Sequence, residues 1–365
     1  MSELDKIRKN INNIDEQMAQ LFEKRMEMSE QVAAFKKARG LSIRDAERER
    51  ELIDRNRRHI TDPAVASYYV QFLRGVLDLS CAYQSRLLSG MKVAYSGVEG
   101  AYGYLAARRM FPEARLVAYP DFAAAHRAVE VGEADSVVLP LENSYAGEVG
   151  AVMDLLFSGE LYINQVLDME IDHSLLGVEN ATVDTVRAVV SHPQALRQCD
   201  DYIKRRGYAT ETYSNTAMAA EYVRRTNDPA LAAIASEDAA EVFGLQVLER
   251  GINTAKTNAT RFAALSRTRN QPETTKKRED ENFVLVFTVQ NDAGSLAQTL
   301  NIIGAHGYNM RTLRSRPMKG LSWTYFFYVE AAGCINNTTG REMLQELSAT
   351  CAKLRLVGSY YANSR

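Results

Sequence analysis

The sequence predicts a multidomain protein with an all-helical N-terminal region, a bilobed α/β central region and a C-terminal βαββαβ module. Charged residues make up 26 of the first 60, and no glycine precedes Gly40 and no proline precedes Pro63, which is typical of long solvated helices. From Lys92 onward, short apolar runs alternate with helical stretches. After a polar segment at 266–282, the apolar runs follow the order of a ferredoxin-like module.

The composition excludes several classes of protein. The 365 residues are enough for two or three domains, and the net charge of −2 gives no electrostatic footprint for a nucleic acid. No apolar run reaches the ~18 residues that a membrane span needs, and the N-terminus does not resemble a signal peptide. Four cysteines without a C-x-x-C pair and five histidines without ligand spacing predict no disulfide framework and no metal site. We therefore expect a cytoplasmic protein without a cofactor.

The first 90 residues predict three helices. Apolar residues recur in alternating steps of three and four along one face of the first helix, at Leu4, Ile7, Ile11, Ile14, Met18, Leu21, Met28, Val32 and Phe35. Further helices are expected at about 43–59 and 62–88, the latter after an N-cap signal at Asp62. One helix of more than 30 residues cannot be covered by two shorter ones, so the seam predicts at least a homodimer, with a tetramer left open.

The central and C-terminal regions predict strands separated by helices. Central strands are expected at 92–96, 136–140, 187–191, 230–236 and 260–265. C-terminal strands are expected at 283–289, 311–316, 324–330 and 354–361, with helices at 295–306 and 340–353. The predicted domains are therefore 1–90, 91–268 and 282–365, with a linker at 269–281.

Cations on the first helix predict either ion pairs or an anion site. Arg25 interrupts the apolar seam, where an unpaired guanidinium is costly, so either a glutamate or an anionic ligand must meet it. Lys36 lies ~16 Å along the same face and Arg8 ~25 Å in the other direction. Arg8 could therefore serve the same ligand only from a second subunit.

Polar residues on the next two helices have two interpretations. Asp45, Arg48 and Glu49 occupy positions i, i+3 and i+4, and Ser80 and Gln84 are one turn apart. Each group taken alone is typical of a solvated helix surface. Beside the cations of the first helix, the same groups are also suited to a small polar ligand.

Five segments of this region resemble the all-helical chorismate mutases, in order and in spacing: IRKNINNID, EKRMEM, AAFKK, IRDAERERELI and DLSCAYQ. The resemblance implies that cations bind the carboxylates and ether oxygen of chorismate, namely Arg8 of the partner subunit, Arg25, Lys36 and Arg48. It implies that polar residues bind the hydroxyl and complete the pocket, namely Asp45, Glu49, Ser80 and Gln84. A Claisen rearrangement needs a folded substrate and positive charge at the breaking ether bond, so Lys36 and Gln84 are the candidate catalytic residues.

Four central motifs follow or open predicted strands, where open α/β sheets bind ligands: AYSGVEGAY (94–102), PLENSYAG (140–147), SHPQ (191–194) and NATRF (258–262). Each taken alone is also typical of a turn or a helix cap. Together with IDHSLL, NTAMAA and GLQVLERGI they resemble prephenate dehydratases over residues 92–267. The resemblance implies two α/β subdomains like those of a periplasmic binding protein, with the active site between them.

The same resemblance implies roles for individual residues. Thr260 is the expected catalytic residue, and the expected substrate-binding residues are Asn143, Ser144, Gln194, Thr216 and Arg261. Glu142 and His192 are weaker candidates. The reaction expels CO₂ and a ring hydroxyl from prephenate, so a hydrogen-bond donor at the departing hydroxide and an apolar environment for the leaving carboxylate would help. The chain departs from the family where Gly103 replaces a serine or threonine and Val98 a proline.

The C-terminal module resembles the ACT regulatory domain, which binds phenylalanine between two chains. The resemblance rests on NDAGSLAQTL (291–300) and LRSRP (313–317), and it implies an effector site at Gly294, Ser295, Leu296, Arg314, Ser315, Arg316 and Pro317. The familiar pattern has a glutamate where Arg314 stands and an alanine where Ser295 stands. Loss of that acid could remove an ion pair or weaken the amino-acid site.

The whole chain is therefore expected to be a bifunctional enzyme of phenylalanine biosynthesis. It would rearrange chorismate, convert prephenate to phenylpyruvate and respond to phenylalanine. Three alternatives remain: a chain with one live activity, a dehydratase that uses arogenate, and a noncatalytic amino-acid sensor.

Overall fold

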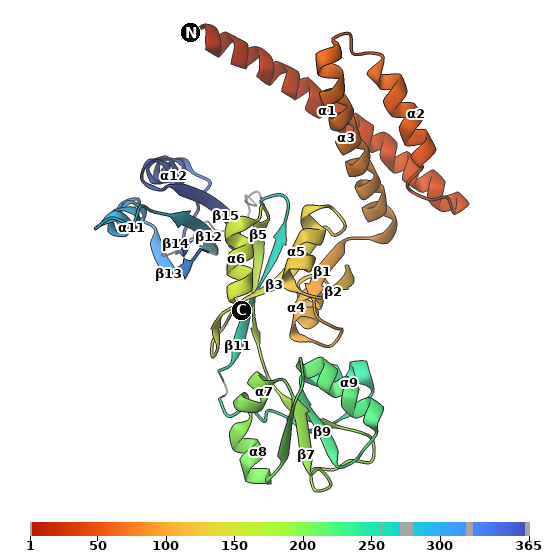
Figure 1. The fold of residues 1–365 in the computed structure, drawn as a ribbon, viewed down its shortest axis with the longest axis vertical. Helices are drawn as coiled ribbons and strands as arrows, with labels where there is room; N and C mark the ends of the chain where they lie inside the picture. Colours follow the sequence, from red (N-terminus) through yellow and green to blue (C-terminus); the bar gives the residue numbers. More distant parts are fainter. Residues whose placement is uncertain (1, 256, 271–279, 319–323, 362–365) are drawn as a thin grey trace. The chain divides into compact units, whose positions relative to one another are not determined.

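The structure is a computed structural model that describes residues 2–255, 257–270, 280–318 and 324–361. The chain forms two compact units (Figure 1). The first comprises residues 1–92 and 113–115, and the second comprises residues 93–112 and 116–365. Within the described residues, no helix combines the length and apolar character needed to span a membrane.

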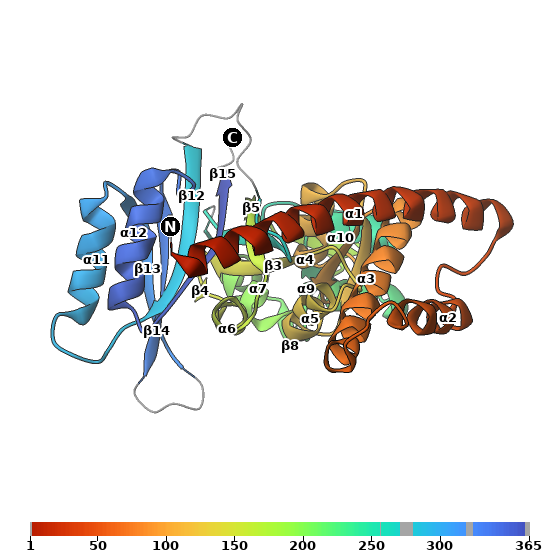
Figure 2. The same cartoon turned by 90° about the horizontal axis from the view of Figure 1, so that it is seen from above.

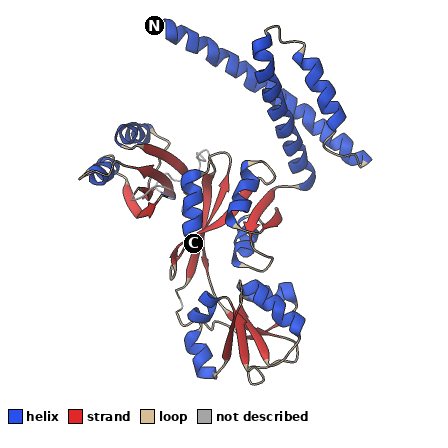
Figure 3. Cartoon of the chain, viewed as in Figure 1, coloured by secondary structure: helices blue, strands red, loops and turns tan. Residues whose placement is uncertain are grey.

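The first unit is helical, as the sequence predicts (Figure 3). Its helices are α1 (Glu3–Arg39), α2 (Ala46–Arg57) and α3 (Pro63–Ser89). Helix α1 is uninterrupted (Figure 2), because a capping box between Ser2 and Asp5 starts it and Gly40, with φ 64°, ends it. The expected position of Asp45 on the second helix needs a correction. Asp45 is the N-cap of α2, where its carboxylate accepts the N–H of Arg48.

Helix α1 leaves its apolar seam largely uncovered within one chain. Only Ser29 and Ala33 of α1 are buried. All nine predicted seam residues are exposed, from Val32 at 43% to Leu21 at 65%. A contiguous apolar stripe of this length is unusual on an isolated chain and favours burial by a partner.

The second unit begins with a lobe built on five neighbouring strands of a larger sheet, in the order β5-β11-β3-β1-β2, with β4 paired to β3. These strands are β1 (Lys92–Ser96), β2 (Arg115–Tyr119), β3 (Ser136–Asn143), β4 (Gly147–Glu148), β5 (Tyr162–Glu170) and β11 (Ala259–Ser266). Its helices are α4 (Tyr102–Met110), α5 (Phe122–Glu130) and α6 (Gly150–Ser158). We call this part the first lobe.

The second lobe is inserted between β5 and β11 and has its own five-stranded sheet, in the order β10-β6-β9-β7-β8. Its strands are β6 (Ser174–Gly177), β7 (Ala188–Ser191), β8 (Ala209–Thr212), β9 (Leu231–Ala235) and β10 (Gln246–Glu249). Its helices are α7 (Pro193–Gln198), α8 (Asp200–Arg206), α9 (Thr216–Thr226) and α10 (Glu237–Phe243). Separate apolar clusters lie on the two faces, with α9 on one and α7 and α8 on the other (Figure 1).

The C-terminal module has the predicted βαββαβ order. Its elements are β12 (Glu281–Thr288), α11 (Ser295–Ala305), β13 (Asn309–Pro317), β14 (Tyr325–Ala332), α12 (Thr338–Thr350) and β15 (Lys353–Tyr361). Helices α11 and α12 lie side by side on one face of the sheet (Figures 1 and 2). The other face packs on α6 of the first lobe, where Phe157 stacks on Phe326 at a centroid distance of 4.4 Å.

The predicted linker at 269–281 needs one correction. Glu281 is its expected last residue, but it is 2% exposed and begins β12, where it pairs with Tyr361 of β15. Residues 271–279 of the linker lie outside the described residues.

Candidate active sites

A cavity of about 690 Å³ lies between the two lobes of the second unit. The first lobe contributes Asn143 from the end of β3 and Thr260 from β11, and the second lobe contributes Gln194 and Thr216. The structure thus brings together four predicted site residues that are distant in sequence. Apolar side chains form part of the wall, including Val149, Ile171 and Phe262.

Asn143 and Thr260 form a hydrogen-bonded pair at the cavity. Asn143 Nδ2 donates to Thr260 Oγ1 at 3.0 Å and to Asn258 Oδ1 at 2.8 Å, while its Oδ1 accepts the N–H groups of Tyr145 and Ala146. These bonds fix the orientation of the amide. Because Thr260 Oγ1 accepts from Asn143, its hydroxyl proton remains available for a ligand.

The second lobe presents the starts of two helices to the cavity. Thr216 is the first residue of α9, where Asn215 caps the helix by accepting the N–H of Met218 at 2.8 Å. His192 caps α7, and its Nδ1 accepts the N–H of Gln194 at 3.2 Å. Burial, helped by the nearby Arg197 charge, lowers the pKa of His192, which is consistent with a neutral ring that accepts.

Three cavity residues that the sequence reasoning missed form a hydrogen-bonded chain. Tyr102 Oη lies 3.0 Å from His173 Nδ1, and His173 Nε2 lies 2.9 Å from Gln198 Oε1. His173 is 2% exposed, and burial lowers its pKa. The buried Nε2 of Gln198 has no hydrogen-bond partner among the described residues. This hydrogen-bonded chain therefore presents the Nε2 donor of Gln198 to whatever occupies the cavity.

Little in the sequence pointed to this chain of residues. His173 lies in IDHSLL and Gln198 follows SHPQ, but a lone histidine or glutamine carries no spacing pattern of its own. Only the approach of α4, the start of β6 and α7 brings these three residues together.

The glycine-rich loop lies at the cavity and includes the departures at positions 98 and 103. Gly97 and Gly100 have φ values of 104° and 81°, which favour glycine. A Cβ at Gly103 would lie 3.2 Å from the backbone oxygen of Ser96, so a larger residue there would require a shift. Both Val98 and Gly103 line the cavity, as does the hydroxyl-bearing Ser96.

Two predicted substrate-binding residues do not line the cavity. Ser144 Oγ donates to Thr257 O at 3.0 Å and accepts the N–H of Ala259 at 2.9 Å, so it joins β3 to the segment before β11. Arg261 binds Asp168 at 2.7 Å, and this contact raises the pKa of the guanidinium. Arg261 alternates with Thr260 along β11 and therefore points to the other face of the sheet.

The predicted effector residues do not share one hollow in the structure. Gly294, with φ 89°, starts α11 and lines a hollow of about 440 Å³ with Gln298 and Asn301, and Ser295 and Leu296 follow it on the helix. On β13, Arg314 and Arg316 instead bind carboxylates of the first lobe: Glu142 for Arg314, and Glu148 and Asp154 for Arg316. Ser315 and Pro317 alternate with them and are exposed.

In the first unit, Arg25 meets neither a glutamate nor another acid among the described residues. It donates to Ser80 Oγ, which in turn donates to Val76 O at 2.7 Å. Burial lowers the pKa of Arg25. One turn further along α3, Gln84 is 7% exposed, and its Oε1 has no hydrogen-bond partner among the described residues. Three predicted pocket residues thus lie on facing surfaces of α1 and α3.

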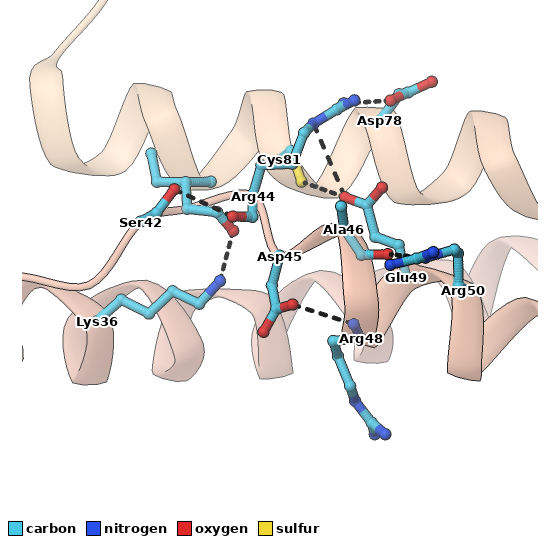
Figure 4. Close-up of polar contacts among 11 residues, drawn as sticks. Lys36, Ser42, Arg44, Asp45, Ala46, Arg48, Glu49, Arg50, Asp78 and Cys81 are labelled. Atoms are coloured by element: carbon cyan, nitrogen blue, oxygen red, sulfur yellow. Dashed lines mark hydrogen bonds and ion pairs between the residues drawn. The ribbon is translucent and has the colours of Figure 1, made fainter.

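Other predicted residues of this unit lie on α1 and α2, on either side of the loop that joins the two helices (Figure 4). Lys36 Nζ donates to the backbone oxygen of Ile43, and Glu49 accepts from the Cys81 thiol at 3.8 Å. The Arg48 side chain points away from Lys36 and Glu49 (Figure 4). It pairs with Glu51 at 3.3 Å. The structure therefore does not bring Arg48 to Lys36 within one chain.

Arg44, which the sequence reasoning missed, occupies the space beside Glu49. Its guanidinium lies 3.8 Å from Glu49 Oε1 and also binds Asp78 (Figure 4). The residue stands next to Asp45 in a run of charges, where spacing alone could not distinguish it from Arg48. Arg8 is exposed on α1.

Comparison with known proteins agrees with this division of sites. The family model for chorismate mutase type II matches residues 7–85, and that for prephenate dehydratase matches residues 93–270. The bifunctional chorismate mutase/prephenate dehydratase of Enterobacter agglomerans is 31% identical over 97% of this chain and 95% of its own length.

Two solved structures are similar to about three quarters of the chain. Prephenate dehydratase from Arthrobacter aurescens in complex with L-Phe is 25% identical, with a TM-score of 0.68, over 74% of this chain and 90% of that one. A protein described as a quorum-quenching acylase is 31% identical, with a TM-score of 0.68, over 75% of this chain and 98% of that one.

Proposed function

The chain belongs to the bifunctional chorismate mutase/prephenate dehydratase family, and from this premise we propose that its two units carry the two reactions separately. The helical unit rearranges chorismate to prephenate, and the cavity of the second unit converts prephenate to phenylpyruvate. The observation that supports the dehydratase most strongly is the Asn143–Thr260 pair, whose threonine proton remains available at the cavity.

For the dehydratase we propose that Thr260 donates a hydrogen bond to the departing ring hydroxyl. As the bond to the carboxylate carbon breaks, its electrons aromatise the ring and CO₂ leaves. The departing hydroxide takes the Thr260 hydroxyl proton and leaves as water, and solvent then returns a proton to Thr260. The Asn143 amide stabilises charge that develops on the threonine oxygen. The apolar wall at Val149, Ile171 and Phe262 favours loss of the carboxylate charge.

For the mutase we propose that Arg25, Lys36 and Arg8 of the partner subunit hold the two carboxylates of chorismate, with Arg48 brought in when ligand binds. Lys36 and Gln84 serve the ether oxygen, where negative charge grows as the carbon–oxygen bond breaks. An ether oxygen only accepts, so Gln84 would serve it through its Nε2 donor, while its buried Oε1, which has no partner among the described residues, suits a donor such as the hydroxyl of the ligand. Asp45, Glu49 and Ser80 complete the pocket.

One coupled assay tests both activities. Pure chain is supplied with chorismate, and chorismate, prephenate and phenylpyruvate are followed with time. We expect Thr260→Val to lower phenylpyruvate formation by roughly 100-fold or more, the scale of a lost proton donor, and to leave chorismate loss unchanged. Arg8→Ala should do the reverse. Loss of both activities in either variant would contradict separate sites.

The alternatives from the sequence differ in this assay. Prephenate that accumulates without phenylpyruvate indicates a dead dehydratase. Faster turnover of arogenate than of prephenate identifies arogenate as the second substrate. A chain that consumes neither chorismate nor prephenate but binds an amino acid is a sensor.

We propose that the C-terminal module is an ACT domain of ferredoxin-like fold that binds phenylalanine and inhibits the dehydratase. Its βαββαβ order and the L-Phe complex of the Arthrobacter aurescens relative support this proposal. The N-terminal end of α11 at Gly294, Ser295 and Leu296 suits the carboxylate of an amino acid through the helix dipole. Calorimetric titration without binding at millimolar phenylalanine would contradict it.

We also propose a homodimer, which the exposed seam of α1 supports because a second copy would cover it. The domain boundaries at 90 and 268 and a cytoplasmic location remain predictions of the sequence.

A further inference from the structure

The two cavity residues Asn143 and Thr260 lie opposite each other on paired strands. In the antiparallel ladder of β3 and β11, Thr260 pairs with Asn143 and Arg261 pairs with Glu142. Since successive residues of a strand point to opposite faces, Glu142 and Arg261 share the face away from the cavity. Each is covalently joined to a cavity residue.

Both of these charged residues bind the C-terminal module. The Glu142 carboxylate accepts from the Arg314 guanidinium on β13. Arg261 lies 3.4 Å from Glu330 on β14, in addition to its contact with Asp168 on the neighbouring strand β5. The module thus contacts the first lobe directly behind the cavity.

These ion pairs are more than surface decoration. The Arg314 and Glu142 side chains are 18% and 33% exposed, and those of Arg261 and Glu330 are 31% and 4% exposed. Pairs that are largely withheld from water are screened little, and removing one partner leaves a charge without compensation. A glutamate at position 314, which the familiar ACT pattern would predict, would face Glu142 with like charge.

We propose that Glu142 and Arg261, held by Arg314 and Glu330 of the C-terminal module, are positioning residues for Asn143 and Thr260. This inference rests on the proposed dehydratase function of the cavity. It gives the module a direct mechanical route to the reacting groups: a displacement of β13 or β14 moves the β3–β11 ladder, and with it the donor pair. Arg314 therefore acts through Glu142, not as a ligand of substrate.

A double-mutant cycle on Glu142 and Arg314 in the full chain tests this. We expect Arg314→Gln and Glu142→Gln each to lower kcat for phenylpyruvate formation by roughly five- to thirtyfold, with KM changed less than about twofold. The effect lies below the ~100-fold expected of a 1 Å misplacement. The double variant should fall no further than either single variant. The charge-swapped chain Glu142→Arg/Arg314→Glu should recover most of the activity that Arg314→Glu alone loses.

Lys353→Ala is the matched control. Lys353 is also a cation of the C-terminal module that contacts the first lobe, through the backbone oxygen of Phe157 at 3.4 Å, but its partner on α6 is not joined to a cavity residue. The kcat of the Lys353→Ala chain for phenylpyruvate formation should equal that of the wild type. Mutase activity, measured in the same samples, should be unchanged in every variant.

Strictly multiplicative effects of the two single changes, or an equal loss in Lys353→Ala, would show that the pairs merely hold the interface together and would overturn the inference. The inference would also be overturned if Arg314→Gln and Arg314→Glu both kept the kcat of the wild type. If the wild-type chain forms no phenylpyruvate, the proposed function itself has failed. An active wild type with unaffected variants contradicts only the positioning role.

Discussion

Thr260 and Arg261 are neighbours in the chain but act on opposite faces of β11. Thr260 faces the cavity with Asn143, whereas Arg261 binds Asp168 and Glu330. A motif of adjacent polar residues on a strand therefore does not make one site. The same holds for Asn143 and Ser144, of which only the first lines the cavity.

Gln198 offers a prediction at the scale of one residue. Its Oε1 is engaged by His173, and its Nε2 is buried without a protein partner among the described residues. In Gln198→Glu, a carboxylate replaces this donor, so we expect KM for dianionic prephenate to rise at least about tenfold through like-charge repulsion. Steady-state kinetics measure the effect, with mutase turnover as the internal control. An unchanged KM would remove Gln198 from the substrate site.

The buried histidines predict how stability depends on pH. Burial lowers the pKa of His126, which Glu130 partly opposes, and of His173. Their pKa is near 6.5 in the unfolded chain, so below that value the unfolded state binds more protons and the free energy of unfolding falls. We expect the free energy of unfolding to fall by at most about 1.4 kcal/mol per pH unit for each histidine as the pH drops from about 6.5. Urea unfolding of the second unit between pH 7.5 and 5.5 checks it; a stability that rises on acidification would contradict it.

At the scale of elements, α1 is the clearest case of a helix whose role one chain cannot fulfil. Its local signals are complete, with a capping box at one end and a left-handed glycine at the other. Its apolar seam is nevertheless exposed. The stability of such a helix comes mainly from packing of its apolar face, so a covering partner is required.

A charge on the seam should separate the subunits. We expect Ile11→Glu to shift the chain from dimer to monomer in sedimentation velocity and to abolish mutase activity, because a buried unpaired carboxylate destabilises an apolar interface. Dehydratase activity should persist. Asn13→Glu adds the same charge away from the seam and should leave the dimer intact. A dimer that survives Ile11→Glu would place the interface elsewhere.

At the scale of the whole molecule, the proposed mutase pocket needs two chains and the dehydratase cavity one. Asn143, Gln194, Thr216 and Thr260 all lie in one unit of one chain. Arg8 lies ~25 Å from Arg25 along the same helix, beyond the reach of a shared small ligand. The two reactions should therefore respond differently to the mixing of subunits.

Mixing two inactive chains tests the shared mutase pocket. When Arg8→Ala and Arg25→Ala chains are co-refolded, half of the dimers are mixed and each has one intact pocket, so about a quarter of wild-type mutase activity should return. A mixture of Arg25→Ala and Lys36→Ala chains should stay inactive, since both residues come from the same chain. Equal recovery in the two mixtures would contradict a contribution of Arg8 from the partner.

The sequence by itself determined the elements and the chemistry. Helix caps, the seam, the βαββαβ order and five of the eleven strands of the two lobes follow from local periodicity and turn residues, which act over a few neighbouring positions. The resemblance of the central motifs to prephenate dehydratases pointed to Thr260, Asn143, Gln194 and Thr216, which the structure places at the cavity.

Only the tertiary structure decided which side chains share a space. It added Tyr102, His173 and Gln198 to the cavity, turned Arg261 to the C-terminal module and placed Arg44 beside Glu49. Arg314, a departure from its motif, found a counter-charge in Glu142 from a strand more than 150 positions earlier. Contacts of this kind depend on the pairing of strands that are distant in the sequence, where a shift of one residue would move every side chain to the other face.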